Sequence, residues 1–196
     1  MISVGGSGVT VNVRNVVLEG LGASGAFLSG IYYDDGAQGK IENTQIRGFY
    51  SAGIQAFESH VVIRRNIVQD NGSVGIQVTN GVYEIVHNNV SNHASYGIEL
   101  EGELSDTRAM SNQLQGNGNG LWVGGSSANV SRNDLLQSQI RGIVAAAGSA
   151  QNTFTMNVVL GVGTGQPSCE DLGVGNQWLR NSSDTPSSPP EICPVP

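Results

Sequence analysis

A Gly-Ile dipeptide, once replaced by Gly-Leu, returns six times along the chain at nearly constant intervals. The pairs are Gly30-Ile31, Gly53-Ile54, Gly75-Ile76, Gly97-Ile98, Gly120-Leu121 and Gly142-Ile143. Neighbouring pairs are about 22 residues apart throughout, a spacing typical of structural repeats. A parallel series of asparagines recurs with nearly the same period: Asn43, Asn66, Asn89, Asn112, Asn133 and Asn157. Two independent series with one period indicate stacked repeats, and a period in the low twenties predicts a β-solenoid.

The most regular repeat, residues 61–82, reads VVIRRNIVQDNGSVGIQVTNGV. It contains three short strand-like pieces, residues 61–64, 67–69 and 76–79, which are separated by Asn and Gly turn residues. Three strands in about 22 residues make one coil of a three-faced parallel β-helix. We therefore expect an all-β chain of about seven coils.

Side-chain alternation along strands predicts which residues face inward. The first and third residues after each glycine are mainly apolar and should form the core: Ile31, Tyr33, Ile54, Ala56, Ile76, Val78, Ile98, Leu100, Leu121, Val123, Ile143 and Ala145. The second and fourth should face outward: Tyr32, Asp34, Gln55, Phe57, Gln77, Thr79, Glu99, Glu101, Trp122, Gly124, Val144 and Ala146. We interpret the asparagine series as structural, because a turn amide can bond the backbone of its own coil and the next.

Composition argues against two classes of partner. The net charge is −7 and Lys40 is the only lysine, so nucleic acid and anionic membranes, which need basic patches, are poor partners. No apolar run reaches membrane-spanning length. Met1-Ile2-Ser3 does not begin a signal peptide, so we expect a chain that is mature, trimmed, or not exported by that route.

The two ends depart from the repeat. We expect residues 1–160 to form the β-helix, with a strand over Val9 to Leu18 and an insertion around residues 20–25. No amphipathic helix precedes the first coil, which leaves open further coils upstream or self-association through that uncapped coil. Residues 161–196 break the period and should form a C-terminal cap. Its Cys169 and Cys193 either form a disulfide, which implies an oxidising compartment, or stay as two thiols.

The pattern N-x-(V/I/L)…N-G-x-x-G-I-x-(V/L), seen in Asn66 to Val78, resembles the right-handed parallel β-helix proteins of the pectin-lyase-like superfamily. The tail, with Gly175-Asn176-Gln177-Trp178 between its cysteines, is similar to the ends of secreted bacterial β-helix proteins. The resemblance covers roughly Val9 to Arg180 and implies an extracellular, periplasmic or cell-surface location. The superfamily includes pectate lyases, polygalacturonases, alginate epimerases, phage tailspikes and adhesins, so it specifies the fold more than the activity.

In enzymes of this superfamily the site lies on the outward face of one parallel sheet, here the sheet that follows Gly-Ile. The resemblance thus implies Tyr32, Asp34, Gln55, Phe57, Gln77 and Trp122 as substrate-binding candidates and Glu99 and Glu101 as catalytic candidates. The Cα atoms of Glu99 and Glu101 should lie about 6.6 Å apart, and inverting glycosidases separate their carboxyl groups by roughly 6.5–9.5 Å. An ordinary solvated strand face has the same pattern.

Other chemistries fit less well. Asp34-Asp35 beside Tyr32 leaves Ca²⁺ open as a cofactor, although Asp-Asp-Gly is also a turn sequence. Lyases of this superfamily use an Arg or Lys as the base, and neither residue lies at the outward positions. The Asp-Pro-His-Asp run of the epimerases and the aspartate pattern of the polygalacturonases are not found in the sequence either. The three histidines lack metal-ligand spacing and are interpreted as surface or turn residues: His60, His87 and His93.

We therefore expect a non-catalytic extracellular β-helix that binds carbohydrate or serves as a scaffold or adhesive module. The alternative is a polysaccharide-degrading hydrolase or lyase that acts through Glu99 and Glu101. The short intervals between strands favour binding, because long loops normally wall the substrate cleft of enzymes with this fold.

Overall fold

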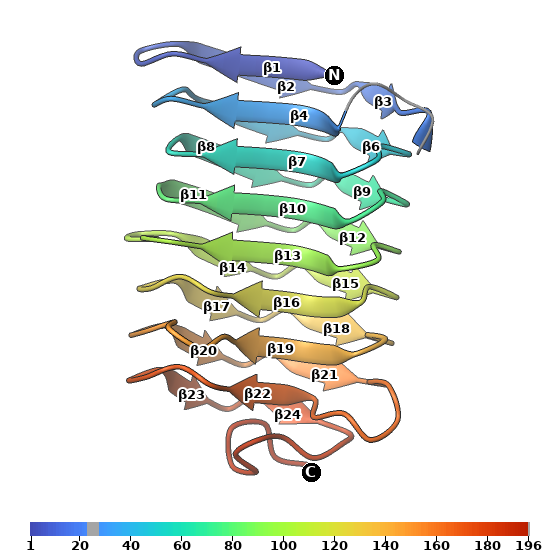
Figure 1. Ribbon diagram of the computed structural model, residues 1–196, viewed down its shortest axis with the longest axis vertical. Helices are drawn as coiled ribbons and strands as arrows, with labels where there is room; N and C mark the ends of the chain where they lie inside the picture. The colour runs from blue at the N-terminus through green and yellow to red at the C-terminus, as the bar shows by residue number, and fades with distance from the viewer. Residues whose placement is uncertain (23–27, 196) are drawn as a thin grey trace.

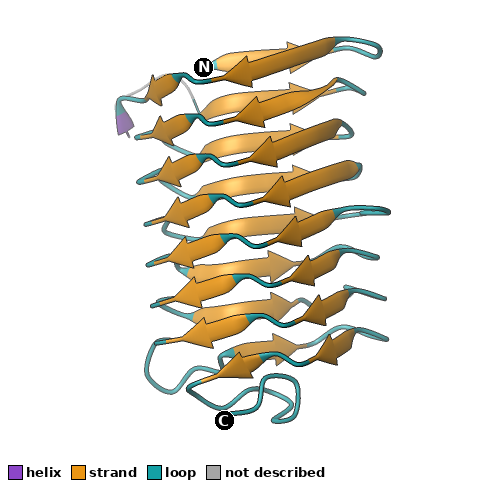
Figure 2. Ribbon diagram, turned by 180° about the vertical axis from the view of Figure 1, so that it is seen from behind, coloured by secondary structure: helices purple, strands orange, loops and turns teal. Residues whose placement is uncertain are grey.

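The computed structural model describes residues 1–22 and 28–195, which wind into one stack of coils (Figure 1). Each coil gives one strand to each of three parallel sheets, A, B and C, and each sheet has eight strands among the described residues (Figure 2). The chain makes seven turns between the first and the last strand of each sheet, which confirms the predicted all-β architecture of about seven coils. No helix in these residues is both long and apolar enough to cross a membrane.

Sheet A contains β1 (Ile2–Gly5), β4 (Ser29–Asp34), β7 (Ala52–Phe57), β10 (Val74–Thr79), β13 (Tyr96–Glu101), β16 (Asn119–Val123), β19 (Arg141–Ala145) and β22 (Cys169–Asp171). Sheet B contains β2 (Thr10–Arg14), β5 (Gln38–Glu42), β8 (His60–Arg64), β11 (Val82–Val86), β14 (Arg108–Met110), β17 (Asn129–Ser131), β20 (Thr153–Thr155) and β23 (Gln177–Leu179). Sheet C contains β3 (Val17–Glu19), β6 (Gln45–Arg47), β9 (Ile67–Gln69), β12 (Asn89–Ser91), β15 (Gln113–Gln115), β18 (Asp134–Leu136), β21 (Val158–Leu160) and β24 (Ser182–Ser183).

The Gly-Ile series sets the register of sheet A. From Ile31 to Ile143 the apolar residue of each dipeptide pairs with its equivalent in the next coil, and the twelve predicted inward positions are all fully buried. The first step, from Ile2 to Ile31, is longer than the later ones and contains the predicted insertion, of which residues 23–27 lie outside the described residues.

The glycine of the dipeptide is required by a close approach at the corner between sheets C and A. A Cβ atom on Gly53 would lie 2.4 Å from Cγ1 of Val68, and one on Gly142 would lie 2.1 Å from Cγ1 of Val159. Real Cβ contacts are not this short, so a larger residue would force the sheet C core side chain out of place. The dipeptide therefore marks a packing constraint, which explains why it repeats.

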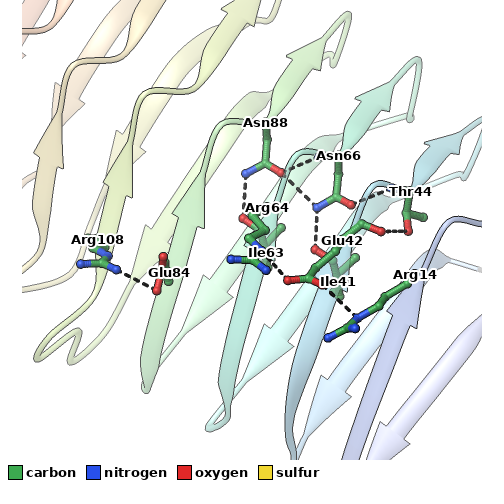
Figure 3. A network of polar contacts seen from close by, with 10 residues as sticks. All are labelled: Arg14, Ile41, Glu42, Thr44, Ile63, Arg64, Asn66, Glu84, Asn88 and Arg108. Atoms are coloured by element: carbon green, nitrogen blue, oxygen red, sulfur yellow. Dashed lines mark hydrogen bonds and ion pairs between the residues drawn. The ribbon is translucent and has the colours of Figure 1, made fainter.

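Buried amides join the coils at the turn before sheet C (Figure 3). The Nδ2 atom of Asn66 donates to the carbonyl oxygen of Ile41 at 2.9 Å, and Oδ1 of Asn88 accepts from both N and Nδ2 of Asn66 at 3.0 Å. The pattern continues through Asn112, Asn133, Asn157 and Asn181. These side chains satisfy backbone groups that the turn leaves without a sheet partner.

Two members of the predicted asparagine series were wrong. Asn43 and Asn89 are exposed, and their neighbours Thr44 and Asn88 occupy the buried positions. Each buried member directly precedes a sheet C strand and follows a residue with φ between 52° and 56°, such as Asn43. Spacing alone could not separate adjacent residues at this turn, because the two differ by only one position.

A second buried polar series, not predicted, lies at the turn between sheets C and A. Oδ1 of Asn71 accepts from the N–H of Phe49, and Nδ2 of Asn71 contacts Nε2 of His93 at 3.2 Å. Oδ1 of Asn117 lies 2.8 Å from Nδ1 of His93, so this ring must carry its proton on Nδ1 and accept at Nε2. The three histidines were predicted to be surface or turn residues. His60 and His87 are exposed, whereas His93 lies in a turn and is only 1% exposed.

The C-terminal segment closes the stack. Trp178 stacks on Phe154 with ring centroids 4.0 Å apart, and Ile192 covers the end of the core. Cys169 and Cys193 form a disulfide with Cα atoms 6.0 Å apart, which confirms the first of the two alternatives. Residues 161–196 also supply β22, β23 and β24, so the sheets continue into the segment expected to cap them.

We predict that Asn112→Ala lowers the free energy of unfolding by about 3 kcal/mol, because the backbone N–H of Asn88, one N–H of its side chain and the Ile85 carbonyl lose their partner at Asn112. Asn89→Ala should cost less than about 0.5 kcal/mol, since Asn89 is exposed. Urea unfolding of both variants measures this. Equal losses would contradict the structural role of the buried series.

We predict that His93 makes the fold acid-sensitive. Burial, which outweighs the Asn117 hydrogen bond and the Asp70 charge, lowers the His93 pKa to about 4, while the unfolded chain binds this proton near pH 6.5. The contribution of His93 is therefore complete above pH 6.5 and is lost as the pH falls to 4, by about 3 kcal/mol. His93→Asn, which restores the residue type of its neighbours, should remove this loss. Urea unfolding between pH 4 and 7 measures the effect. If the free energies of unfolding of wild type and His93→Asn differed by the same amount at every pH, the prediction would be wrong.

Candidate functional site

The outer face of sheet A contains every residue predicted for the site. Register pairs place Tyr32, Gln55, Gln77, Glu99 and Trp122 in one column across β4, β7, β10, β13 and β16. A second column contains Phe57, Thr79 and Glu101, and Asp34 ends β4. These side chains are partly exposed, as the alternation predicts. Val144 and Ala146, also expected to face outward, are instead buried.

A chain of hydrogen bonds runs along the first column. The hydroxyl of Ser29 donates to Oε1 of Gln55, and Nε2 of Gln55 donates to Oε1 of Gln77 at 2.6 Å. Gln77 in turn hydrogen-bonds the carboxyl group of Glu99. Each hydrogen bond fixes which end of the next side-chain amide is the donor and which is the acceptor, so the polar groups of this column have defined orientations.

The Glu99 carboxyl is the most perturbed acid of the face. Burial raises its pKa, the negative charge of Glu101 raises it further, and the Gln77 hydrogen bond opposes both, giving a value of about 7. Burial disfavours the charged form because the strand face holds less water than bulk solvent. Glu99 is therefore a carboxyl group that exchanges a proton near neutral pH.

The Glu101 carboxylate is held across the next coil. Nε1 of Trp122 donates to Oε1 of Glu101 at 3.0 Å. A Cβ atom on Gly124 would lie 2.4 Å from both carboxylate oxygens of Glu101, so the carboxylate occupies space that only glycine leaves free. The two glutamates thus differ in environment although they share one strand.

Tyr96 completes this group, and the sequence analysis missed it. Its ring lies 5.2 Å from that of Trp122, tilted by 39°. Burial raises the Tyr96 pKa, with smaller contributions from the charges of Glu99 and Glu101. Tyr96 precedes the Gly-Ile dipeptide, where the alternation rule was not applied; an aromatic residue at that position was the available signal.

A second aromatic pair lies at the other end of the column. The rings of Tyr32 and Phe57 are 5.7 Å apart, and the Tyr32 hydroxyl donates to Oδ2 of Asp34 at 2.9 Å. Oδ1 of Asp34 accepts from the N–H of Asp35, which with Gly36 has positive φ, so this segment forms the turn. In the described residues no three His, Cys, Asp or Glu side chains are grouped to hold a metal ion.

Arg141 is a second residue that the sequence analysis missed. It begins β19, one residue before Gly142, and its Nε atom lies 2.8 Å from Oε2 of Glu170. The outward positions themselves hold no Arg or Lys, but Arg141 brings a cation to the same sheet from the position before Gly142. Its ion pair occupies the guanidinium, whereas a lyase base must be free to take a proton.

We predict that Glu99 opposes His93 in the pH dependence of stability. Because the folded pKa of about 7 exceeds the unfolded value of 4.5, the folded state binds more protons between these limits. Wild-type protein should therefore lose stability relative to Glu99→Gln as the pH rises from 4.5 to 7. Urea unfolding measures this, with the exposed Glu103→Gln as control. If the difference in free energy of unfolding between wild type and Glu99→Gln did not change with pH, the pKa of Glu99 would be the same in the folded and unfolded states, and the prediction would be wrong.

Comparison with known proteins supports the architecture. Residues 1–159 match the family described as "Right handed beta helix region". A similar solved structure is the "Crystal structure of Dettilon tailspike protein (gp208)", with 18% identity and a TM-score of 0.52 over 87% of this chain and 47% of that chain. The chain thus spans about half of that protein, and the likeness concerns the fold alone. No curated protein matches it. Because the family match covers most of the sequence, this chain belongs to the right-handed β-helix family.

Proposed function

We propose that this protein is an extracellular module that binds an extended polysaccharide along the outer face of sheet A and does not cleave it. The observation that carries the proposal is the ordered column of Gln55, Gln77 and Glu99 between two aromatic pairs, Tyr32–Phe57 and Tyr96–Trp122. Fixed amides and carboxyls bond sugar hydroxyls, and aromatic rings pack on sugar faces. A binding role is consistent with a surface built from short turns.

The spacing of the column supports a polymer rather than a single sugar. Neighbouring strands of a sheet are about 4.8 Å apart, so the column offers a polar group at each coil. A repeating ligand that runs parallel to the axis of the coils can engage several coils at once, which raises affinity by linked binding.

The disulfide supports the extracellular part of the proposal. Cys169 and Cys193 are the only cysteines, and their pairing fits a protein that matures in an oxidising compartment. The bridge ties the tail to β22 and contributes roughly 3 kcal/mol by the loop-entropy model. Such a tail suits a protein exposed outside the cell.

A second candidate is glycoside hydrolysis, favoured by the raised Glu99 pKa. A carboxyl group with a pKa of about 7 can remain protonated and donate to a glycosidic oxygen, while a carboxylate on Glu101 activates water. The contrast between a desolvated acid and an anchored carboxylate is the pattern that divides acid and base roles in glycosidases. The ion-paired Arg141 makes a lyase less suited to this face.

We predict that Trp122→Ala weakens polysaccharide binding at least tenfold and that wild type releases no reducing ends. Trp122→Phe, which keeps the ring but loses the bond to Glu101, should lose less. The matched control is Gln113→Ala, an exposed change on sheet C. Affinity electrophoresis through neutral and acidic polysaccharides, with a reducing-end assay, measures both properties.

The same experiment decides between the two candidates. Reducing ends that wild type releases and Glu99→Gln does not would establish the hydrolase and overturn the non-catalytic proposal. Equal binding by wild type and Trp122→Ala would show that the ligand occupies another face.

A further inference from the structure

Charge is distributed unevenly around the coils. We define the acidic face as the strands of sheet A together with the turns that lead from each of them to sheet B. Counting only side chains at outward positions of the strands and in the turns, it holds eight of the sixteen carboxylate side chains of the protein: Asp34, Asp35, Glu58, Glu99, Glu101, Glu103, Asp106 and Glu170. Of the nine basic side chains it holds one, Arg141. The other eight carboxylates and the other eight basic residues balance, so the net charge of −7 resides on the acidic face.

The basic residues outside the acidic face do not neutralise it. On sheet B, Glu42 is buried between Arg14 and Arg64, and Arg108 pairs with Glu84 at 2.8 Å (Figure 3). These three guanidinium groups thus pair with two carboxylates of their own sheet, not with those of the acidic face. On the acidic face itself, Arg141 is paired with Glu170, which leaves the remaining carboxylates without a cation among the described residues.

The acidity extends to the edge of the face. A shallow pocket between sheets A and B is lined by Glu58, Asn80, Gly81, Val82, Glu103 and Ser105. Its two carboxylates, Glu58 and Glu103, belong to the acidic face and lie in the turns that follow β7 and β13. A ligand that lies along the column therefore passes a row of like charges rather than a single pair.

We infer that the polysaccharide bound on the acidic face is uncharged, a hydroxyl-rich polymer of neutral sugars without uronate, sulfate or phosphate groups. This inference rests on the proposed function and adds the ligand class to it. A polyanion would bring its charges against carboxylates that lack counter-ions, which is unfavourable at close range and only partly screened by salt. The amides of Gln55 and Gln77 supply neutral donors and acceptors instead.

The environment of Glu99 points to the same ligand class. Burial and the charge of Glu101 already disfavour the ionised form of Glu99, and a ligand carboxylate would disfavour it further. A sugar hydroxyl adds no charge and can accept from the protonated carboxyl group or donate to the ionised one. Neutral hydroxyls are thus compatible with both protonation states.

The experiment compares matched polymers. Soluble glucan, galactan and mannan are each tested before and after oxidation of their primary hydroxyls to carboxylates, by affinity electrophoresis at 0.05 M and 0.5 M NaCl. At least one neutral polymer should bind, and oxidation should weaken its binding at least tenfold at low salt. Because repulsion is screened, part of this loss should be recovered at high salt, while binding of the neutral form should change little.

Two double variants test where the discrimination arises. Glu58→Gln with Glu103→Gln removes charge from the pocket edge and should reduce the loss on oxidation. Asp134→Asn with Glu191→Gln removes equal charge from exposed sites outside the acidic face and should leave the loss unchanged. If both double variants reduced the loss of binding on oxidation by a similar factor, the loss would depend on the overall charge of the protein, and the assignment to the acidic face would be overturned.

The outcomes separate the two proposals. Oxidised polymers that bind as well as or better than neutral ones would overturn the neutral-ligand inference and leave polysaccharide binding intact. Binding of neither form of any polymer, nor of polygalacturonate or alginate, would count against the proposed function and the inference together.

Discussion

The stack of coils depends on hydrogen bonds between identical turns. In a parallel β-helix the strands pair with their equivalents above and below, but the corners would leave buried amides without partners. Here the side chains of Asn66, Asn88, Asn112, Asn133 and Asn157 supply those bonds, each amide contacting the preceding coil and the next. The near-constant length of the repeat follows, because an insertion before sheet C would take an amide out of reach of its neighbour.

That requirement explains which parts of the protein the sequence predicts. The buried glycine and apolar positions repeat because every coil packs in the same way, so the fold and the inward side chains could be derived from spacing. The choice between Asn88 and Asn89 could not, since it depends on which residue of the turn takes positive φ, here His87, and the buried asparagine is the one that follows it. Tyr96 and Arg141 were missed for a different reason: both precede the dipeptide, where the alternation rule was not applied, although both begin strands of sheet A.

The candidate site is formed by departures from the repeat on a surface that the repeat makes rigid. Gly124 occupies a position where other coils carry a side chain such as Glu101 or Thr79, and the vacancy receives the Glu101 carboxylate. Neither the sequence position of Gly124 nor that of Trp122 indicates this contact. It requires the register that places β16 directly beside β13.

The buried His93 and the half-buried Glu99 make the stability of the protein depend on pH in opposite directions. His93 is kept neutral by burial, which outweighs the opposing effect of the Asn117 hydrogen bond on its pKa. Its bonds to Asn71 and Asn117 suit only one tautomer, and the residue serves the fold. Glu99 is kept partly protonated by burial and by the charge of Glu101, an arrangement that lowers stability as the pH rises above the unfolded pKa of this carboxyl group. The repeat does not require two carboxyl groups on this strand face, and their cost to stability is therefore one of the observations behind the proposed ligand-binding role of the face.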